Sequence, residues 1–118
     1  MKDSNIIQQK SYQFALRIVK LYVFLQKEKK EFALAKQILR SGTSIGANIE
    51  ESIGAQSRKD FLSKISIAYK ETRETHYWLR LLNDSDFLTD KEFKSLSADC
   101  EELLKIIGAI QTTTKKTI

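Results

Sequence analysis

The sequence predicts an all-α protein, an antiparallel four-helix bundle with up-down-up-down topology. Three observations support this fold class. The chain contains no proline, which permits long uninterrupted helices. Its apolar residues recur at spacings of three and four in four successive segments, and short polar stretches separate these segments. With 118 residues, of which 42% are hydrophobic and 30% charged, residues 1–118 form a single bundle domain of modest core.

The first helix is predicted over residues 5–27. At about 100° per residue, its apolar side chains occupy well over half of the helix circumference. A helix on the surface of a monomer usually carries an apolar stripe only somewhat wider than about 100°. We therefore expect two faces of this helix to be buried, one by the bundle and one by a second subunit.

The second helix is predicted over residues 32–55, after a charged connection. Gly42 and Gly46 lie four residues apart within it, and a glycine inside a helix costs roughly 1 kcal/mol relative to alanine. A phosphate-binding loop needs one more residue between its glycines and a lysine after the second, both of which are missing. We interpret the glycines as a flat helix-packing ridge, with Asn48 offering its amide for a buried hydrogen bond. A polar pocket on the same face is the alternative.

The third and fourth helices have clear starting signals. The third is predicted over residues 58–83, where Ser57 is a good N-cap with Asp60 three residues later. The fourth is predicted over residues 90–112, where Thr89 and Glu92 have the spacing of a capping box. Beyond residue 112, the tail is expected to fray.

The sequence contains no convincing catalytic or metal-binding set. A di-iron bundle needs Glu-x-x-His on two helices, whereas His76 is the single histidine. The one cysteine, Cys100, lies on the apolar stripe of the fourth helix and is expected to be a buried thiol. We expect no enzyme activity, no metal and no cofactor. A small-molecule enzyme would need a polar pocket assembled from Glu50, Glu71, Glu74 and Tyr77. Charges paired at an interface explain these residues better.

Two runs of sequence resemble a known family. The run LRSGTSIGANIEE and the following SRKDFLSKISIAYKETRETHYWLRLL resemble the four-helix-bundle family encoded in intervening sequences of large-subunit (23S) ribosomal RNA genes. The opening SYQFALRIVKLYVFLQKEKKEFALAKQ is similar to the same family, so that the resemblance covers about residues 10–110. It implies a small bundle that assembles as a homo-oligomer, expected to be a pentamer. It also implies kinship with the nucleic-acid-binding accessory variability protein of diversity-generating retroelements.

Charge distribution favours a nucleic-acid partner. The net charge is +5, and residues 1–59 hold 11 Lys and Arg against 5 Asp and Glu, whereas residues 60–118 hold 9 against 10. In a pentamer the summed charge would be about +25, which favours counterion release from RNA or DNA. The predicted nucleic-acid-binding residues lie on the first two helices: Lys10, Arg17, Lys20, Lys27, Lys36 and Arg40.

An alternative function is an oligomeric scaffold or adapter that binds a protein partner without contacting nucleic acid. The wide apolar surface of the first helix and the lack of a catalytic set motivate it. The start of the chain is polar and no apolar run approaches the ~18 residues of a spanning helix, so no membrane association is expected. A single cysteine fits a reducing, cytoplasmic location.

Overall fold

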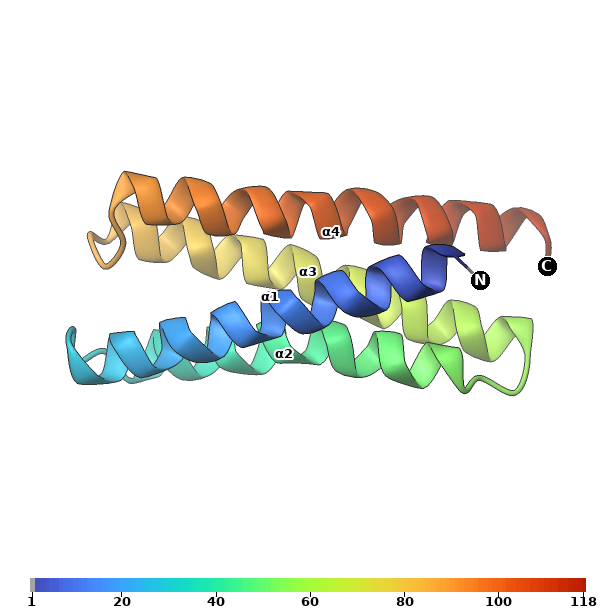
Figure 1. Cartoon of the computed structure of the whole chain (residues 1–118), viewed down its shortest axis with the longest axis horizontal. Helices are drawn as coiled ribbons and strands as arrows, with labels where there is room; N and C mark the ends of the chain where they lie inside the picture. Colours follow the sequence, from blue (N-terminus) through green and yellow to red (C-terminus); the bar gives the residue numbers. More distant parts are fainter. Residues whose placement is uncertain (1) are drawn as a thin grey trace.

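The computed structural model describes residues 2–118, which form four antiparallel helices (Figure 1). These are α1 (Lys2–Lys27), α2 (Ala33–Ile53), α3 (Arg58–Asp84) and α4 (Asp90–Lys116). No strand occurs among these residues. Both ends of the chain lie at the same end of the bundle, as an up-down-up-down path requires (Figure 1). The predicted fold class is confirmed.

The helices contact one another in chain order around the bundle. α2 packs against both α1 and α3, α4 packs against α3, and α1 closes the ring against α4. α1 and α3 therefore occupy diagonally opposite corners, and α1 crosses the bundle obliquely so that its N-terminal part approaches α4 (Figure 1). The molecule is elongated, measuring 46 × 21 × 19 Å.

One apolar core runs the length of the bundle. Every helix contributes side chains that are shielded from solvent, and large branched residues dominate among them. Fully buried examples from α1 to α4 are Ile18, Leu25, Ile38, Ile45, Ile65, Leu79 and Ile107. Because buried apolar area is the main favourable term in folding, this core holds the four helices together.

The predicted caps on α3 and α4 are present. Ser57 Oγ accepts a hydrogen bond of 3.0 Å from the Asp60 backbone N–H, and Thr89 and Glu92 form a reciprocal capping box. α2 begins without a side-chain bond from its N-cap residue. Instead, a carboxylate oxygen of Glu31 accepts hydrogen bonds from the first backbone N–H groups of α2, which the helix cannot satisfy internally.

The helix bounds differ from the expected ones mainly at the two ends of the chain. α1 begins at Lys2 and α4 continues to Lys116, so the tail does not fray at residue 112. Thr114 is buried, and its hydroxyl donates to the Ile110 carbonyl at 2.7 Å. Arg58 at the start of α3 donates to the Thr117 hydroxyl. The contact from Arg58 of α3 and the burial of Thr114 stabilise the last turn, which its local sequence alone did not predict.

The two glycines of α2 face α1 at close range. A Cβ atom added at Gly42 would lie 2.8 Å from the Ile18 side chain, and one at Gly46 would lie 3.4 Å from the Ser11 carbonyl oxygen. Real Cβ atoms do not approach other atoms as closely as 2.8 Å, so Gly42 has no room for a side chain. Asn48 does not bridge helices, since its amide donates to Ser44 within α2.

Candidate nucleic-acid interface

Two of the predicted nucleic-acid-binding residues on α1 face α4. The Lys10 ammonium lies 3.1 Å from a carboxylate oxygen of Glu102. The Arg17 guanidinium lies 2.6 Å from a carboxylate oxygen of Asp99 and also donates to the Ser95 hydroxyl at 2.9 Å. These ion pairs connect α1 to α4 and neutralise both cations, so each would have to exchange its carboxylate partner for a phosphate before binding nucleic acid.

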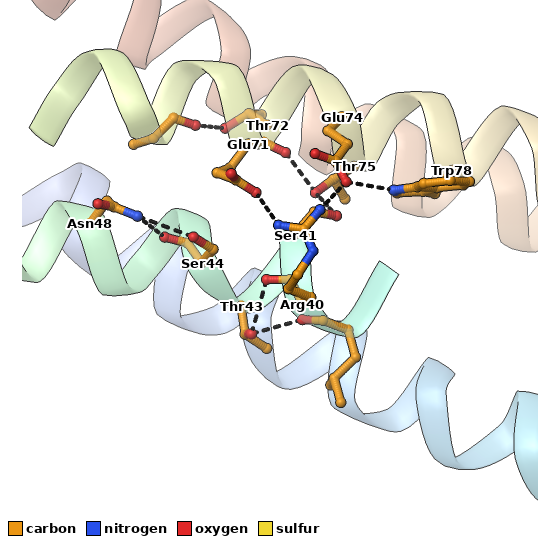
Figure 2. A network of polar contacts seen from close by, with 12 residues as sticks. Arg40, Ser41, Thr43, Ser44, Asn48, Glu71, Thr72, Glu74, Thr75 and Trp78 are labelled. Atoms are coloured by element: carbon orange, nitrogen blue, oxygen red, sulfur yellow. Dashed lines mark hydrogen bonds and ion pairs between the residues drawn. The ribbon is translucent and has the colours of Figure 1, made fainter. Parts of the chain in front are cut away.

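Arg40 on α2 forms ion pairs with two carboxylates of α3 (Figure 2). One nitrogen of its guanidinium lies 3.1 Å from Glu71, and the other contacts Glu74. Trp78 donates its indole N–H to the same Glu74 carboxylate at 2.9 Å. This hydrogen bond from Trp78, together with the Arg40 contact, lowers the pKa of Glu74 below the ordinary glutamate value. The Glu74 hydrogen bond correspondingly raises the pKa of Arg40.

The other three predicted cations are Lys20, Lys27 and Lys36, and all three are exposed. None forms an ion pair with an acidic side chain within residues 6–118, for which side chains are described. Lys20 and Lys27 lie seven residues apart on one side of α1, and Lys36 lies in the first turns of α2, at the same end of the bundle as Lys27 (Figure 1). The structure thus divides the six predicted cations into three that are paired and three that are available.

An exposed apolar stripe lies directly beside Lys20 and Lys27 on α1. It comprises Tyr12, Leu16, Val19 and Val23, whose side chains are between 41% and 60% exposed. Their spacing of four, three and four residues places them on one face of the helix. This stripe is the outward part of the wide apolar surface that the sequence predicts for the first helix.

The carboxylates considered for an enzyme pocket do not converge. Glu50 accepts a hydrogen bond of 3.0 Å from Gln8 on α1, whereas Glu71 and Glu74 are held by Arg40. Tyr77 is exposed on the outer side of α3. Within the described part of the chain, no three His, Cys, Asp or Glu side chains are grouped so that they could hold a metal ion.

The surroundings of His76 and Cys100 indicate structural roles for both side chains. The His76 Nε2 atom lies 3.2 Å from the Ser97 hydroxyl and 3.5 Å from a carboxylate oxygen of Glu101, both on α4. Cys100 is fully buried, and desolvation raises the pKa of its thiol to about 12. A thiol with so high a pKa stays protonated near neutral pH and is a poor nucleophile.

Sequence reasoning missed a buried polar contact between α2 and α3. The hydroxyls of Ser41 and Thr75 are 2.8 Å apart, and Thr75 also donates to the Glu71 carbonyl at 2.8 Å (Figure 2). Both side chains are fully buried. The available signal was the presence of hydroxyl residues on the apolar faces of both helices, which require hydrogen-bond partners once buried.

A groove lies at the end of the bundle where α2 connects to α3. It has a volume of about 970 Å³, and its wall combines apolar side chains with two cations, Arg58 and Lys105. No carboxylate, imidazole or thiol lines it. The groove therefore offers no pair of groups for acid–base chemistry. The candidate binding residues lie instead on the charged outer faces of the helices.

Comparisons with known proteins identify the family. Residues 3–109 match the model of the 23S rRNA-intervening sequence protein. The chain belongs to this family. A crystal structure of a protein with unknown function from the S23 ribosomal protein family of Bacteroides thetaiotaomicron is 50% identical, with a TM-score of 0.92. That match covers 93% of this chain and 98% of the other. No curated protein matches the chain.

The family assignment confirms the resemblance drawn from the sequence, including the run from Leu39 to Glu51 around the glycines of α2. It assigns no activity, since the similar crystal structure is itself described as that of a protein with unknown function. Among the helices formed by residues 2–118, none is both long enough and apolar enough to cross a bilayer.

Proposed function

We propose that this family member is a non-enzymatic homo-oligomer that associates with RNA or other nucleic acid. The observation that carries the proposal is the combination on α1 of an exposed apolar stripe and two unpaired lysines beside it. The stripe would bury itself against a second copy of the chain. Lys20, Lys27 and Lys36 of each copy would then line a shared basic surface.

The apolar stripe supports self-association. Exposed apolar residues scattered singly are ordinary, but four neighbouring ones on a single helix face form a patch of the kind that protein interfaces use. The family resemblance implies a closed ring of five, in which the α1 stripe of each copy would pack against a different face of its neighbour, because pairing of identical faces closes a dimer. Such a ring would have five times the monomer mass of 13.6 kDa, about 68 kDa.

Unpaired lysines support the nucleic-acid part of the proposal. A cation that has no carboxylate partner can contact a phosphate without first breaking an ion pair, and each such contact releases counterions. Lys10, Arg17 and Arg40 would contribute less, because their carboxylate partners already neutralise them. Binding of this kind is governed by charge and carries little sequence specificity.

The two parts are tested separately. Light scattering should give a mass near that of a pentamer, and a monomer at micromolar concentration would contradict self-association. Affinity for a labelled RNA should fall steeply between about 50 and 200 mM salt. The triple variant Lys20→Gln/Lys27→Gln/Lys36→Gln should bind at least tenfold more weakly. A matched triple variant, Lys94→Gln/Lys115→Gln/Lys116→Gln, should bind as the native chain does.

A protein partner is the second candidate function. The same apolar stripe of α1 favours it, because a foreign helix could cover that stripe as well as a second copy could. In that case the chain would be an oligomeric scaffold or adapter, and RNA binding would be absent even at low salt.

A further inference from the structure

The outward face of α3 carries a basic stripe that charge counting does not reveal. Lys59, Lys70, Arg73 and Arg80 all lie within a sector of about 100° around the helix axis, together with Tyr77. All five side chains are exposed. The sector also contains one carboxylate, Asp84, at its C-terminal end.

Two acidic residues of α3 lie outside this sector. Glu71 and Glu74 face α2, where Arg40 forms ion pairs with both of them (Figure 2). The single charge of Arg40 offsets one of these two carboxylates, and the remaining negative charge lies at the edge of the stripe, where Lys70 interacts with Glu74. None of the four cations forms an ion pair with an acidic side chain within residues 6–118.

An aromatic ring lies in the middle of the stripe. Tyr77 is 48% exposed, and the Arg80 guanidinium carbon lies 5.8 Å from the centre of its ring. The ring packs edge-on against Trp78, with the two ring centres 5.0 Å apart. The contact with Trp78 and the helix backbone restrict the motion of the Tyr77 ring. An ordered, exposed aromatic ring that lies between cations can stack on an unpaired base.

We propose that the outer face of α3 binds an unpaired nucleic-acid strand, with Lys70, Arg73 and Arg80 contacting phosphates and Tyr77 stacking on a base. The proposal rests on the function proposed above and narrows its ligand to single strands. Lys70 and Arg80 are about 15 Å apart along the helix, so the strand would run along α3. A duplex would bind less well, because its bases are paired and stacked internally.

The single tryptophan of the chain offers a direct readout. Trp78 touches the Tyr77 ring, so a base stacked on Tyr77 would change the Trp78 fluorescence. We expect an unstructured RNA 20-mer to quench this fluorescence on binding, and the matching duplex to quench it less. The variant Tyr77→Phe, which keeps the ring, should behave as the native chain does. Tyr77→Ala should lose most of the quenching and bind about fivefold more weakly or worse.

Charge removal tests the phosphate contacts. Arg73→Gln/Arg80→Gln should lower the slope of log affinity against log salt by about 1.4, or about 0.7 for each lost phosphate contact on a single strand. Lys115→Gln/Lys116→Gln at the end of α4 is the matched control and should leave the slope unchanged. Circular dichroism melting should be the same for all of these exposed substitutions, which separates loss of binding from loss of folding.

The outcomes distinguish the two proposals. If the native chain binds RNA and the Lys20/Lys27/Lys36 variant loses binding while the α3 variants do not, the inference on α3 is wrong and the proposed function stands. If the native chain binds neither single-stranded nor double-stranded nucleic acid at low salt, both are wrong, and binding of duplex alone would contradict only the inference on α3. Equal affinity for strand and duplex, with no change of Trp78 fluorescence, would also overturn the role of Tyr77.

Discussion

The outer faces of α1 and α3 occupy opposite corners of one bundle but differ in chemistry. On α1 the outward residues are apolar, and its cations lie at the margin of that stripe or in ion pairs with α4. On α3 the outward residues are cations around a tyrosine, with Asp84 at the C-terminal end, and Glu71 and Glu74 are turned towards α2. An apolar face is stabilised by another protein surface, whereas a basic face is stabilised by water or a polyanion. The comparison supports the proposal that α1 carries the self-association surface and that α3 carries a nucleic-acid surface apart from the lysines beside the α1 stripe.

The largest expected effect is the loss of self-association when charges are placed on the α1 stripe. Leu16→Glu/Val19→Glu would bury two carboxylates in the interface between copies, which is strongly unfavourable without partners. The mass measured by light scattering should therefore fall from that of the oligomer to 13.6 kDa. As a matched control, Lys70→Glu/Arg73→Glu places two carboxylates on the α3 face and should leave the mass unchanged. Equal loss of assembly in both variants would show that the two faces are not separated.

A smaller effect, a loss in the free energy of unfolding, is expected when the packing of α1 on the glycines of α2 is disturbed. Gly42→Leu would force a side chain into the space that Ile18 occupies, and overpacking of this kind costs about 1–3 kcal/mol. Chemical denaturation at one fixed protein concentration should report this loss, and displacement of α1 should also weaken assembly. Gly54→Ala is the control, because a Cβ there would meet only the Glu51 carbonyl at 3.9 Å. A Gly42→Leu protein as stable as the native one would contradict close packing of α1 on α2.

Loss of the buried hydrogen bond between Ser41 of α2 and Thr75 of α3 should lower the free energy of unfolding by a comparable or slightly smaller amount. Thr75→Val keeps the shape of the side chain but leaves the buried Ser41 hydroxyl without its partner, at a cost of about 1–3 kcal/mol. The double variant Ser41→Ala/Thr75→Val should recover part of this loss, as measured by the free energy of unfolding. If the double variant were less stable by the full sum of the single losses, the two hydroxyls would not be coupled.

The smallest expected loss in the free energy of unfolding is for Glu74, whose charge flanks the α3 stripe. Hydrogen bonding from Trp78 and the Arg40 contact lower the pKa of folded Glu74, so its contribution is present above the unfolded value and is lost as pH falls through the folded value. Glu74→Gln should therefore cost less than about 1 kcal/mol near pH 7, as expected for a half-exposed ion pair. The difference from the native chain should shrink as pH falls through the lowered pKa of Glu74. A difference that did not change with pH would show that the Trp78 hydrogen bond, and not the charge, is what matters.

The fold was predictable because its signals are local. Caps at Ser57 and Thr89 marked two helix starts, and three-and-four spacing identified the buried faces. The excess apolar width of the first helix also anticipated the exposed stripe on α1. The last turn of α4 was not predictable, since its stability comes from a contact between Arg58 and Thr117, which are distant in sequence.

The pairing of charges was much harder to predict. A helical wheel identifies the side of a helix on which Arg17 or Arg40 lies, but it does not identify the carboxylate that faces it from another helix. For the same reason, the near-neutral second half of the sequence concealed the basic face of α3. Four of its ten acidic side chains pair with cations of α1 and α2, as Asp99 does with Arg17 and Glu74 with Arg40.

Alkylation of the buried Cys100 can be used to measure local opening of the bundle. The thiol is the only one in the chain, it is inaccessible, and its pKa is raised to about 12. An alkylating reagent can therefore reach it only when α4 separates transiently from the core. The rate of alkylation under native conditions would measure the free energy of that separation. Comparing the rate with and without RNA would show whether a ligand on the outer face of α3 restrains the neighbouring helix.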